Sequence, residues 1–285
     1  MSGPVVVSRR DQLVEAHAAR PGRRAVVMTM GALHEGHLAL VARAREEAAV
    51  VVVTIFVNPL QFGPGEDLDR YPRDLEGDLD RLASVGADVV FAPAPDVVYP
   101  DGDPVVRVSA GRFGEVLEGA ARPGHLDGVL TVVLKLLHLV EPDLALFGRK
   151  DAQQLAAVER MVRDLDIPVD VVPVETVRDP DGLAMSSRNA YLSPAERERA
   201  LALPRALRAG ERAAAEGPEA VRAAAHAALT GQGVELDYLA LVDPATFAEV
   251  PADAAGRAVL AVAASVGATR LIDNIEVDLA TGGSA

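Results

Sequence analysis

Two histidines three residues apart, in the segment Thr29–His37 (TMGALHEGH), have types and spacing that could do chemistry. The segment joins an apolar run over 25–30 to an amphipathic pattern over 37–49. His34 and His37 would therefore lie at the start of a helix that follows a strand. Free N–H groups and the positive end of the helix dipole attract phosphate there. Imidazoles in that place can donate hydrogen bonds to phosphoryl oxygens as charge builds in a transition state.

Two other interpretations of this pair remain open. A metal-binding pair would normally use i, i+4 spacing with a third ligand, and histidines can also cap a helix without further function. The neighbouring residues favour phosphate: Gly31, after Met30, permits a tight turn, and Gly36 lets a ligand approach the backbone. Neither a G-x-x-x-x-G-K-[ST] loop nor a G-x-G-x-x-G fingerprint is present, which disfavours P-loop and ordinary NAD-binding proteins.

A second polar cluster, Gly148–Gln154, follows the apolar run 144–147 and opens a helical pattern over 151–165. Lys150 is one of only two lysines among 28 basic residues, and a compact ammonium can neutralise a phosphate. The alternative is that lysine is rare in this chain only because of a chance bias toward arginine, in which case Lys150 marks no site. Asp151 could contact the nucleotide or simply cap the helix, and the Gln154 amide can both donate and accept.

A third cluster, Met185-Ser186-Ser187-Arg188, supplies two hydroxyls and a guanidinium on a loop. Such groups can clamp a phosphate, although a Ser-Ser-Arg sequence on its own is more often an ordinary loop. The phosphate interpretation of this cluster depends on the presence of the other two clusters in the same chain.

The elements that must position these clusters are apolar strands alternating with helices. Continuous Val/Ile-rich runs of this kind indicate a parallel sheet covered on both faces. We expect an α/β fold over 1–177, a doubly wound Rossmann-like sheet that binds ligands at the carboxyl ends of its strands. The alternation of apolar strands with helices changes near Arg178. Residues 178–285 are expected to form a smaller α+β domain that covers the active site. The predicted strands of the first part are 25–30, 50–57, 88–92, 144–147 and 169–174, and its predicted helices are 37–49, 74–85, 127–140 and 151–165. In the second part, Ser193-Pro194 is expected to open a helix, a second helix is expected over 218–229, and strands are expected over 236–242, 258–262 and 270–277.

Composition narrows the function classes. The chain has 285 residues and no cysteine, which excludes disulfides, thiolate nucleophiles and thiolate metal sites. The formal net charge of −14 argues against a nucleic-acid partner but allows a single nucleotide in a local pocket. No apolar run approaches the roughly 20 residues of a membrane span, and no secretory signal is evident. We therefore expect a cytoplasmic enzyme without a membrane or nucleic-acid partner.

Taken together, the motifs resemble the pantothenate synthetase family, within the nucleotidyltransferase superfamily that carries a His-x-Gly-His motif. The resemblance is spread from about residue 25 to 190, and the C-terminal third matches mainly in kind, including the run Leu271–Asn274. Met28 and Arg149 depart from the usual pattern of the family. The segments that carry the resemblance are Thr29–His37, Phe56–Gly63 (FVNPLQFG), Tyr71–Arg73 (YPR), Arg122–Val129 (RPGHLDGV), Gly148–Leu155 and Met185–Asn189.

The resemblance implies a two-step reaction with ATP and Mg²⁺. The carboxylate of (R)-pantoate would attack the α-phosphorus of ATP, and β-alanine would then attack the acyl carbon of pantoyl adenylate to give pantothenate and AMP. It implies that His37 is the general acid, that His34 and Lys150 share the catalytic work, and that Asp78 lies near magnesium. The nucleotide contacts it implies are Met30, Gly31, His34, Gly36, His37, Gly148, Arg149, Lys150, Asp151, Val177, Met185, Ser186, Ser187 and Arg188.

The resemblance also implies that Gln61 and Gln154 bind pantoate, with Asn58, Glu118 and Arg122 as secondary contacts, and that the protein is a homodimer. Two alternatives stay open. One is another small-molecule adenylyltransferase of the same superfamily, and the other is a catalytically inactive nucleotide-sensing module. The segment Pro64–Asp69 is rich in glycine, proline and acidic residues, and could be a lid or a static surface loop.

Overall fold

The structure of the protein is a computed structural model that describes residues 3–66 and 68–280. The chain forms two compact units. The first runs to Arg149 and resumes over Ala157–Glu175, and the second comprises Lys150–Ala156 and the chain from Thr176 onward. Because the second unit takes over at Thr176, we propose that the domain boundary expected near residue 177 lies there.

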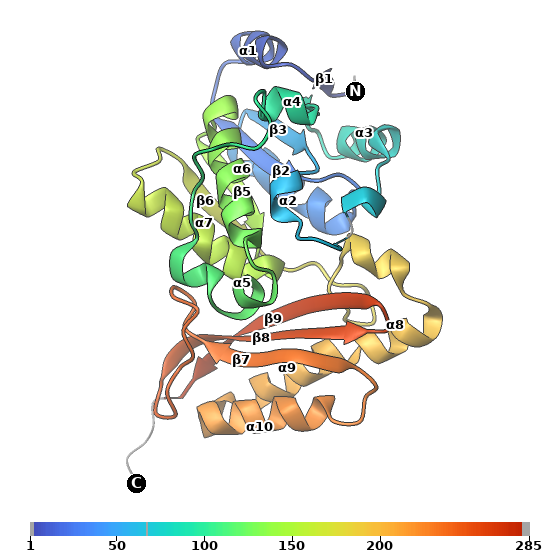
Figure 1. Cartoon of the computed structure of the whole chain (residues 1–285), viewed down its shortest axis with the longest axis vertical. Helices are drawn as coiled ribbons and strands as arrows, with labels where there is room; N and C mark the ends of the chain where they lie inside the picture. Colours follow the sequence, from blue (N-terminus) through green and yellow to red (C-terminus); the bar gives the residue numbers. More distant parts are fainter. Residues whose placement is uncertain (1–2, 67, 281–285) are drawn as a thin grey trace. The chain divides into compact units, whose positions relative to one another are not determined.

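The first unit is built on a six-stranded sheet in the order β1-β4-β3-β2-β5-β6, in which every pairing is parallel. Its central strands are valine-rich and almost fully buried, as expected when helices cover both faces. Figure 1 shows these strands in the colours of the first two thirds of the chain. The strands are β1 (Val5–Val7), β2 (Arg24–Thr29), β3 (Val50–Ile55), β4 (Val89–Phe91), β5 (Leu144–Gly148) and β6 (Asp170–Val174).

The strand order reverses at β2. The chain runs outward on one side through β3 and β4, and on the other side through β5 and β6. β2 is paired with β3 along one edge and with β5 along the other, with Val26 opposite both Val52 and Ala145. In open α/β sheets ligands bind outside the carboxyl ends of the strands at such a reversal. β2 ends at Thr29 and β5 at Gly148, directly before two of the predicted nucleotide-binding segments.

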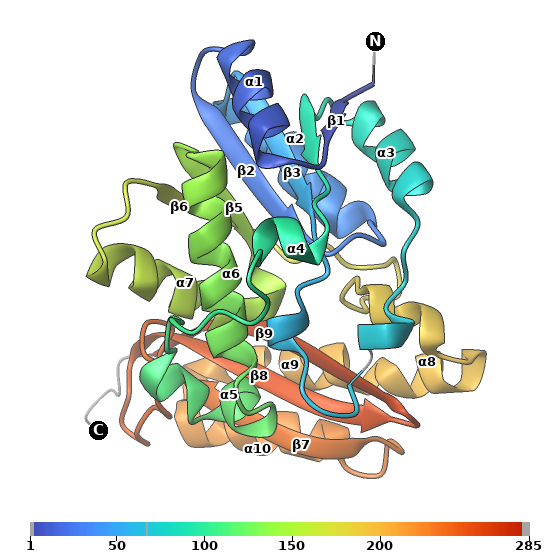
Figure 2. The same cartoon turned by 45° about the horizontal axis from the view of Figure 1, so that its top comes forward.

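Helices flank this sheet. α2 packs on one face, where Val27, Val51 and Leu146 meet its residues Val41 and Ala44. Strand residues that alternate with these point to the opposite face, along which α6 runs (Figure 2). The helices are α1 (Arg10–Ala18), α2 (Glu35–Glu47), α3 (Leu75–Ser84), α4 (Pro95–Val98), α5 (Leu117–Ala121), α6 (His125–Val140) and α7 (Ala152–Asp164), the last beginning in the second unit.

The second unit is an antiparallel three-stranded sheet, β7 (Glu235–Val242), β8 (Gly256–Val266) and β9 (Thr269–Leu279), in that order. α9 (Ala202–Arg212) and α10 (Pro218–Leu229) lie against one face of it, and α8 (Pro194–Ala200) precedes them (Figure 1). A Cβ on Gly210 would lie 2.4 Å from Leu260 Cδ2, so glycine is what lets α9 approach β8 this closely.

The predicted α/β class, with its doubly wound sheet and smaller α+β unit, is confirmed. Sequence patterns missed β1, α1, α4 and α5, which are short or weakly amphipathic. The helix expected from Ser193-Pro194 is divided at Leu201 into α8 and α9. Within residues 3–66 and 68–280, no helix combines the length and hydropathy that crossing a membrane requires.

Candidate active site

His34 and His37 lie together at the start of α2. His34 is the N-cap residue, and its Nδ1 accepts the N–H of Gly36 at 3.2 Å. The Nδ1 of His37 accepts the N–H of His34 at 3.2 Å, and the two ring centroids are 4.1 Å apart. Because both Nδ1 atoms act as acceptors, each neutral ring carries its proton on Nε2. The same contacts that cap the helix therefore present two Nε2–H donors, which suits phosphoryl oxygens.

The turn before these histidines is held by a carboxylate from α3. Asp78 Oδ1 accepts the N–H of Leu33 at 2.7 Å, and its Oδ2 accepts the N–H of Ala32 at 3.0 Å. Gly31 and Ala32 both have positive φ, of 86° and 51°, so the chain turns sharply here. The non-glycine residue in that conformation is strained unless its surroundings hold it, and the Asp78 carboxylate supplies two such bonds.

The carboxylate of Asp78 is buried against the histidine turn. Asp78 is 3% exposed, and each of its carboxylate oxygens accepts a backbone N–H. Burial raises the pKa of this carboxyl, although the hydrogen bonds from Leu33 and Ala32 oppose the rise. Among the described residues there is no group of three or more His, Asp or Glu side chains that could hold a metal ion. The geometry explains Asp78 as a support for the turn, and its predicted contact with magnesium stays a prediction.

Gln61 and Asn58 lie in a second part of the first unit, at the short helix Pro59–Gln61 after β3. Asn58 is 1% exposed and donates from Nδ2 to Gln61 Oε1 and to Gly128 O, each at 3.1 Å. Its Oδ1 accepts the Tyr99 hydroxyl at 2.9 Å. Gln61 Nε2 in turn donates to Met30 Sδ at 3.2 Å. Asn58 therefore acts as a buried support for Gln61, and Gln61 lies beside the residue that begins the histidine turn.

The backbone of this short helix is packed directly on α6. A Cβ on Gly128 would lie 2.2 Å from Leu60 O, so only glycine allows α6 to lie against it. This close approach also brings Gly128 O within reach of Asn58. The second glycine in the motif RPGHLDGV is thereby explained by packing.

Arg122 forms a bidentate ion pair with Glu66, with Nε–Oε1 and Nη2–Oε2 distances of 2.7 Å and 2.6 Å. Its Nη1 lies 2.9 Å from His125 Nε2, and its Nη2 donates to Gln61 O at 3.3 Å. A guanidinium only donates, so His125 Nε2 must be the acceptor. The proton of His125 is then on Nδ1, which donates to Gln61 O at 2.8 Å.

The charge states in this network follow from its geometry. Burial and the adjacent Arg122 lower the pKa of His125, in agreement with a neutral ring. Burial alone would raise the pKa of Glu66, but the hydrogen bond and charge of Arg122 outweigh it and the pKa is lowered. The result is an ionised Glu66, a cationic Arg122 and a neutral His125 that together fix the backbone of Gln61.

In the second unit, Lys150 and Asp151 lie in the short helix Arg149–Asp151 that leads into α7. Lys150 Nζ is 3.8 Å from Asp151 Oδ1, and Lys150 O accepts a 2.8 Å hydrogen bond from Asn274 Nδ2 on β9. Gln154 is partly exposed one turn into the helix. Arg149, which the sequence left unexplained, belongs to the first unit and lies 2.9 Å from Glu175 Oε1.

The Met185–Arg188 segment begins a short helix, Ser187–Tyr191, for which Ser186 is the N-cap. Ser186 Oγ accepts the N–H of Arg188 at 3.3 Å. Met185 donates its N–H to Val177 O at 3.0 Å, which joins this segment to another of the predicted nucleotide contacts. Ser186 therefore has a local capping role, and Ser187 and Arg188 follow it on the same turn.

The structure thus brings together His34 with His37, Met30 with Gln61, and Lys150 with Asp151. Gly31 and Gly36 belong to the histidine turn, and Gly148 ends β5. Sequence reasoning missed Glu66, His125 and Asn274 as members of these networks, and it missed the support that Asp78 gives to the histidine turn. His125 and Asn274 lie inside the quoted motifs, so their presence was signalled but their role was not.

Comparison with known proteins agrees with this geometry. A profile of the Pantoate-beta-alanine ligase family matches residues 6–276. A pantothenate synthetase from Thermobifida fusca is 59% identical over 284 residues, covering 96% of each chain. One from Streptomyces avermitilis is 55% identical over 315 residues, covering 92% of this chain and 95% of the relative.

Solved structures give the same result. The crystal structure of pantothenate synthetase from Thermus thermophilus matches with a TM-score of 0.90 at 49% identity, covering 96% of this chain and 99% of that one. The pantoate-β-alanine ligase of Francisella tularensis, crystallised with β,γ ATP and β-alanine, matches with a TM-score of 0.79 at 33% identity, covering 95% and 97%.

A doubly wound sheet with an imidazole pair at the helix after β2 defines an α/β nucleotide-binding enzyme. Within that class, the chain belongs to the pantoate-β-alanine ligase family.

Proposed function

We propose that this chain condenses (R)-pantoate with β-alanine in a reaction that consumes ATP, and releases pantothenate, AMP and pyrophosphate. The observation that carries the proposal is the imidazole pair at the start of α2, whose Nδ1 atoms are occupied by backbone N–H groups. This arrangement leaves each neutral ring with its proton on Nε2, from which it can donate a hydrogen bond to a phosphate. The family membership, and the ATP and β-alanine in the Francisella crystal structure, support the same chemistry.

In the first step, a carboxylate oxygen of pantoate attacks the α-phosphorus of ATP. The bond from that phosphorus to the bridging oxygen breaks, pyrophosphate leaves, and pantoyl adenylate remains. Two anions must be brought together, so the protein has to neutralise charge and align the reactants, and needs no covalent nucleophile. Well-aligned positioning can supply about 7–11 kcal/mol of such a barrier.

His34 and His37 are proposed to donate Nε2–H hydrogen bonds to the phosphoryl oxygens. His37, for which the resemblance implies the role of general acid, is proposed to stabilise the charge on the leaving pyrophosphate by such a hydrogen bond, because a neutral ring keeps its proton. Lys150 is proposed to neutralise phosphate charge as a compact cation, together with the hydroxyls and guanidinium of Ser186–Arg188. The backbone near Gly148 and Val177 is proposed to contact the nucleotide, with Met30, Gly31, Gly36, Arg149, Asp151 and Met185 as its neighbours.

Gln61 and Gln154 are proposed to bind the hydroxyls and carboxylate of pantoate, because amides bind a polyhydroxy acid without adding charge. For Gln61 the supporting contacts are its hydrogen bonds with Asn58 and Met30. Asn58 and Arg122 act through Gln61 in this proposal, since Asn58 is buried and Arg122 is paired with Glu66.

In the second step, the neutral amine of β-alanine attacks the acyl carbon of pantoyl adenylate. The acyl–oxygen bond breaks, AMP leaves with that oxygen, and the amine loses a proton to solvent. No side chain is assigned as a base for this proton, so the rate of this step should rise with pH as the amine of β-alanine becomes neutral.

Three further parts of the proposal are supported by the resemblance alone. They are that the reaction uses Mg²⁺, that the protein is a homodimer and that it is cytoplasmic. Mg²⁺ is commonly held by substrate phosphates and waters with few protein ligands, so we propose that it enters with ATP. Sedimentation at several concentrations tests the dimer.

The experiment that tests the function is a turnover assay with ATP, pantoate and β-alanine, in which each is omitted in turn. Pantothenate and AMP should appear together only when all three are present. ADP as the nucleotide product, or AMP formation that is indifferent to pantoate, would reject the proposal. AMP transfer to a different acceptor in place of pantoate would instead indicate another adenylyltransferase of the superfamily.

A further inference from the structure

Resting on the proposed function, we propose that Asp273 and Asn274 are positioning residues for adenylation. They are adjacent on β9, in the run Leu271–Asn274 to which no role has so far been given. In this inference Asn274 holds the backbone of Lys150, and Asp273 acts through Arg178 on the turn that precedes Met185–Arg188.

One hydrogen bond from Asn274 holds the main chain of Lys150. Asn274 Nδ2 donates to Lys150 O at 2.8 Å, and Asn274 is 9% exposed. Lys150 O belongs to a short helix of only three residues, Arg149–Asp151. A helix this short fixes few of its own carbonyls, so a buried side-chain donor sets where the main chain of Lys150 lies. The root of the ammonium-bearing side chain is thereby fixed.

An ion pair joins Asp273 to Arg178. Arg178 donates from Nη1 and Nη2 to the two carboxylate oxygens of Asp273, at 2.6 Å and 2.9 Å. The Asp273 side chain is 2% exposed, so water competes little with this bidentate pair. Arg178 Nη1 also donates to Gly182 O at 3.1 Å, and Nη2 donates to Asn274 O at 3.2 Å.

These contacts order the chain that leads to the predicted phosphate clamp. Asp179 donates its N–H to Leu183 O at 2.8 Å, and Arg178 forms a bridge with Ala184. The next residue, Met185, donates its N–H to Val177 O at 3.0 Å. Residues 178–184 therefore form a hairpin-like turn that the guanidinium of Arg178 helps to hold. The chain leaves this turn at Ala184 and continues into Ser186–Arg188.

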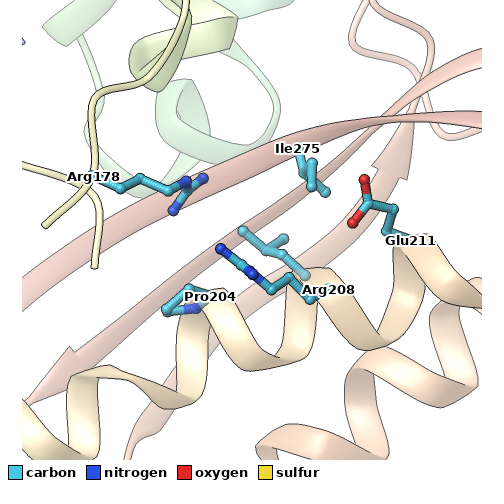
Figure 3. A pocket seen from close by; sticks show the side chains of 6 residues that line it. Arg178, Pro204, Arg208, Glu211 and Ile275 are labelled. Atoms are coloured by element: carbon cyan, nitrogen blue, oxygen red, sulfur yellow. The ribbon is translucent and has the colours of Figure 1, made fainter. Parts of the chain in front are cut away.

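The geometry of a strand explains how two adjacent residues can hold two separate segments. Successive side chains of a strand point to opposite faces of the sheet. Asp273 shares its face with Leu271 and Ile275, which pack in the core of the second unit, and Asn274 points to the other face. Figure 3 shows Arg178 reaching from its loop toward the strand that carries Ile275, at the edge of a pocket of about 220 Å³.

The test is a double-mutant cycle between Asn274 and Lys150, read as pantoate-dependent exchange of labelled pyrophosphate into ATP. Asn274→Ala should lower kcat/KM for ATP by about 10-fold, because a small misplacement of a catalytic group is costly. In the Lys150→Ala background the same change should have less than about 2-fold effect, since the group it positions is gone. The KM for pantoate should stay unchanged.

If Asn274→Ala caused a general loss of structure, it would lower kcat/KM for ATP by the same factor in the wild-type and Lys150→Ala backgrounds, and that result would overturn the inference. Wild-type kinetics of Asn274→Ala would overturn it as well. If Asn274→Ala does not fold, Asn274→Asp keeps the shape and removes the donor. Asp237→Asn serves as the control, because it breaks an exposed ion pair with Arg270 in the same sheet, and it should leave exchange unchanged. Absence of pantoate-dependent exchange in the wild type would overturn the proposed function itself, and this inference with it.

Discussion

Asp78 on α3 accepts a 2.7 Å hydrogen bond from the backbone N–H of Leu33, which precedes His34 in the chain. Together with its bond to Ala32, this contact makes a buried carboxylate part of the histidine turn. The imidazoles can only present their Nε2 atoms in a fixed direction if the turn that carries them is fixed. The position of Asp78 is therefore a condition for the chemistry proposed for His34 and His37.

Asp78→Asn should lower both stability and adenylation. An amide can accept only one of the two N–H groups, and its own NH₂ then faces the other, so one donor is left unsatisfied. A lost charge-assisted hydrogen bond costs about 1.5–3 kcal/mol, measurable by urea denaturation. Asp80→Asn, two residues along on the exposed face of α3, is the matched control and should behave as the wild type. Recovery of Asp78→Asn by added Mg²⁺ would contradict this account and favour a metal ligand.

His37→Asn separates the two roles of His37. The asparagine carbonyl can still accept the N–H of His34, as Nδ1 does, but the distal Nε2–H is lost. We expect a melting temperature close to that of the wild type and a loss of adenylate formation of at least about 10²-fold, the scale of removing one transition-state donor. Near-wild-type turnover would show that the role of His37 is misassigned.

Arg122→Lys should weaken pantoate binding without affecting ATP. A lysine cannot reproduce the bidentate pair with Glu66 or the bonds to His125 and Gln61 O. The backbone of Gln61 would then be held less firmly, and KM for pantoate should rise about 5- to 30-fold, as expected for a loss of about 1–2 kcal/mol. Steady-state kinetics with each substrate varied checks this. Arg112→Lys, at an exposed position, is the control. An equal rise in both KM values would point to general disruption.

The stability of the protein should fall as the pH drops below neutrality. Burial, reinforced by Arg24, lowers the pKa of His17 to about 4, and burial with Arg122 lowers the pKa of His125. An unfolded histidine binds a proton near pH 6.5, whereas the folded ones resist it, so the unfolded state binds more protons below about pH 6.5. The free energy of unfolding therefore decreases between about pH 6.5 and, for His17, about pH 4.

His17→Gln should make that decline shallower, and His226→Gln, at an exposed histidine, should not. Urea denaturation at pH 7, 6 and 5 measures the difference. If the slopes of the wild type and His17→Gln coincide, the buried histidine has no part in the pH dependence.

The sheet could be predicted from sequence because its strands are uninterrupted apolar runs. All four residues of Val50–Val53 are buried. A continuous valine run is typical of a strand that is covered on both faces of a parallel sheet. β1 and α1 could not be found in this way: β1 has three residues, two of them exposed, and α1 has only two buried positions. Short edge elements give little periodic signal, so tertiary contacts decide whether they form.

The histidine turn could also be predicted, because a strand, a glycine turn and a helix leave little choice of place for His34 and His37. The supports of the site could not. Asp78 lies 45 residues from Leu33, Glu66 lies 56 from Arg122, and Asn274 lies 124 from Lys150. No local pattern encodes which distant backbone group a buried carboxylate or amide will meet, so those partners emerge only from the folded chain.

The central claim is that the carboxylate of pantoate attacks the α-phosphorus of ATP, and transfer of oxygen isotope tests it most directly. Pantoate labelled with ¹⁸O in its carboxylate is converted in the presence of ATP and β-alanine, and the nucleotide product is analysed by mass spectrometry. The account predicts AMP that carries one ¹⁸O atom from pantoate. Unlabelled AMP, or label found in inorganic phosphate beside ADP, would contradict it.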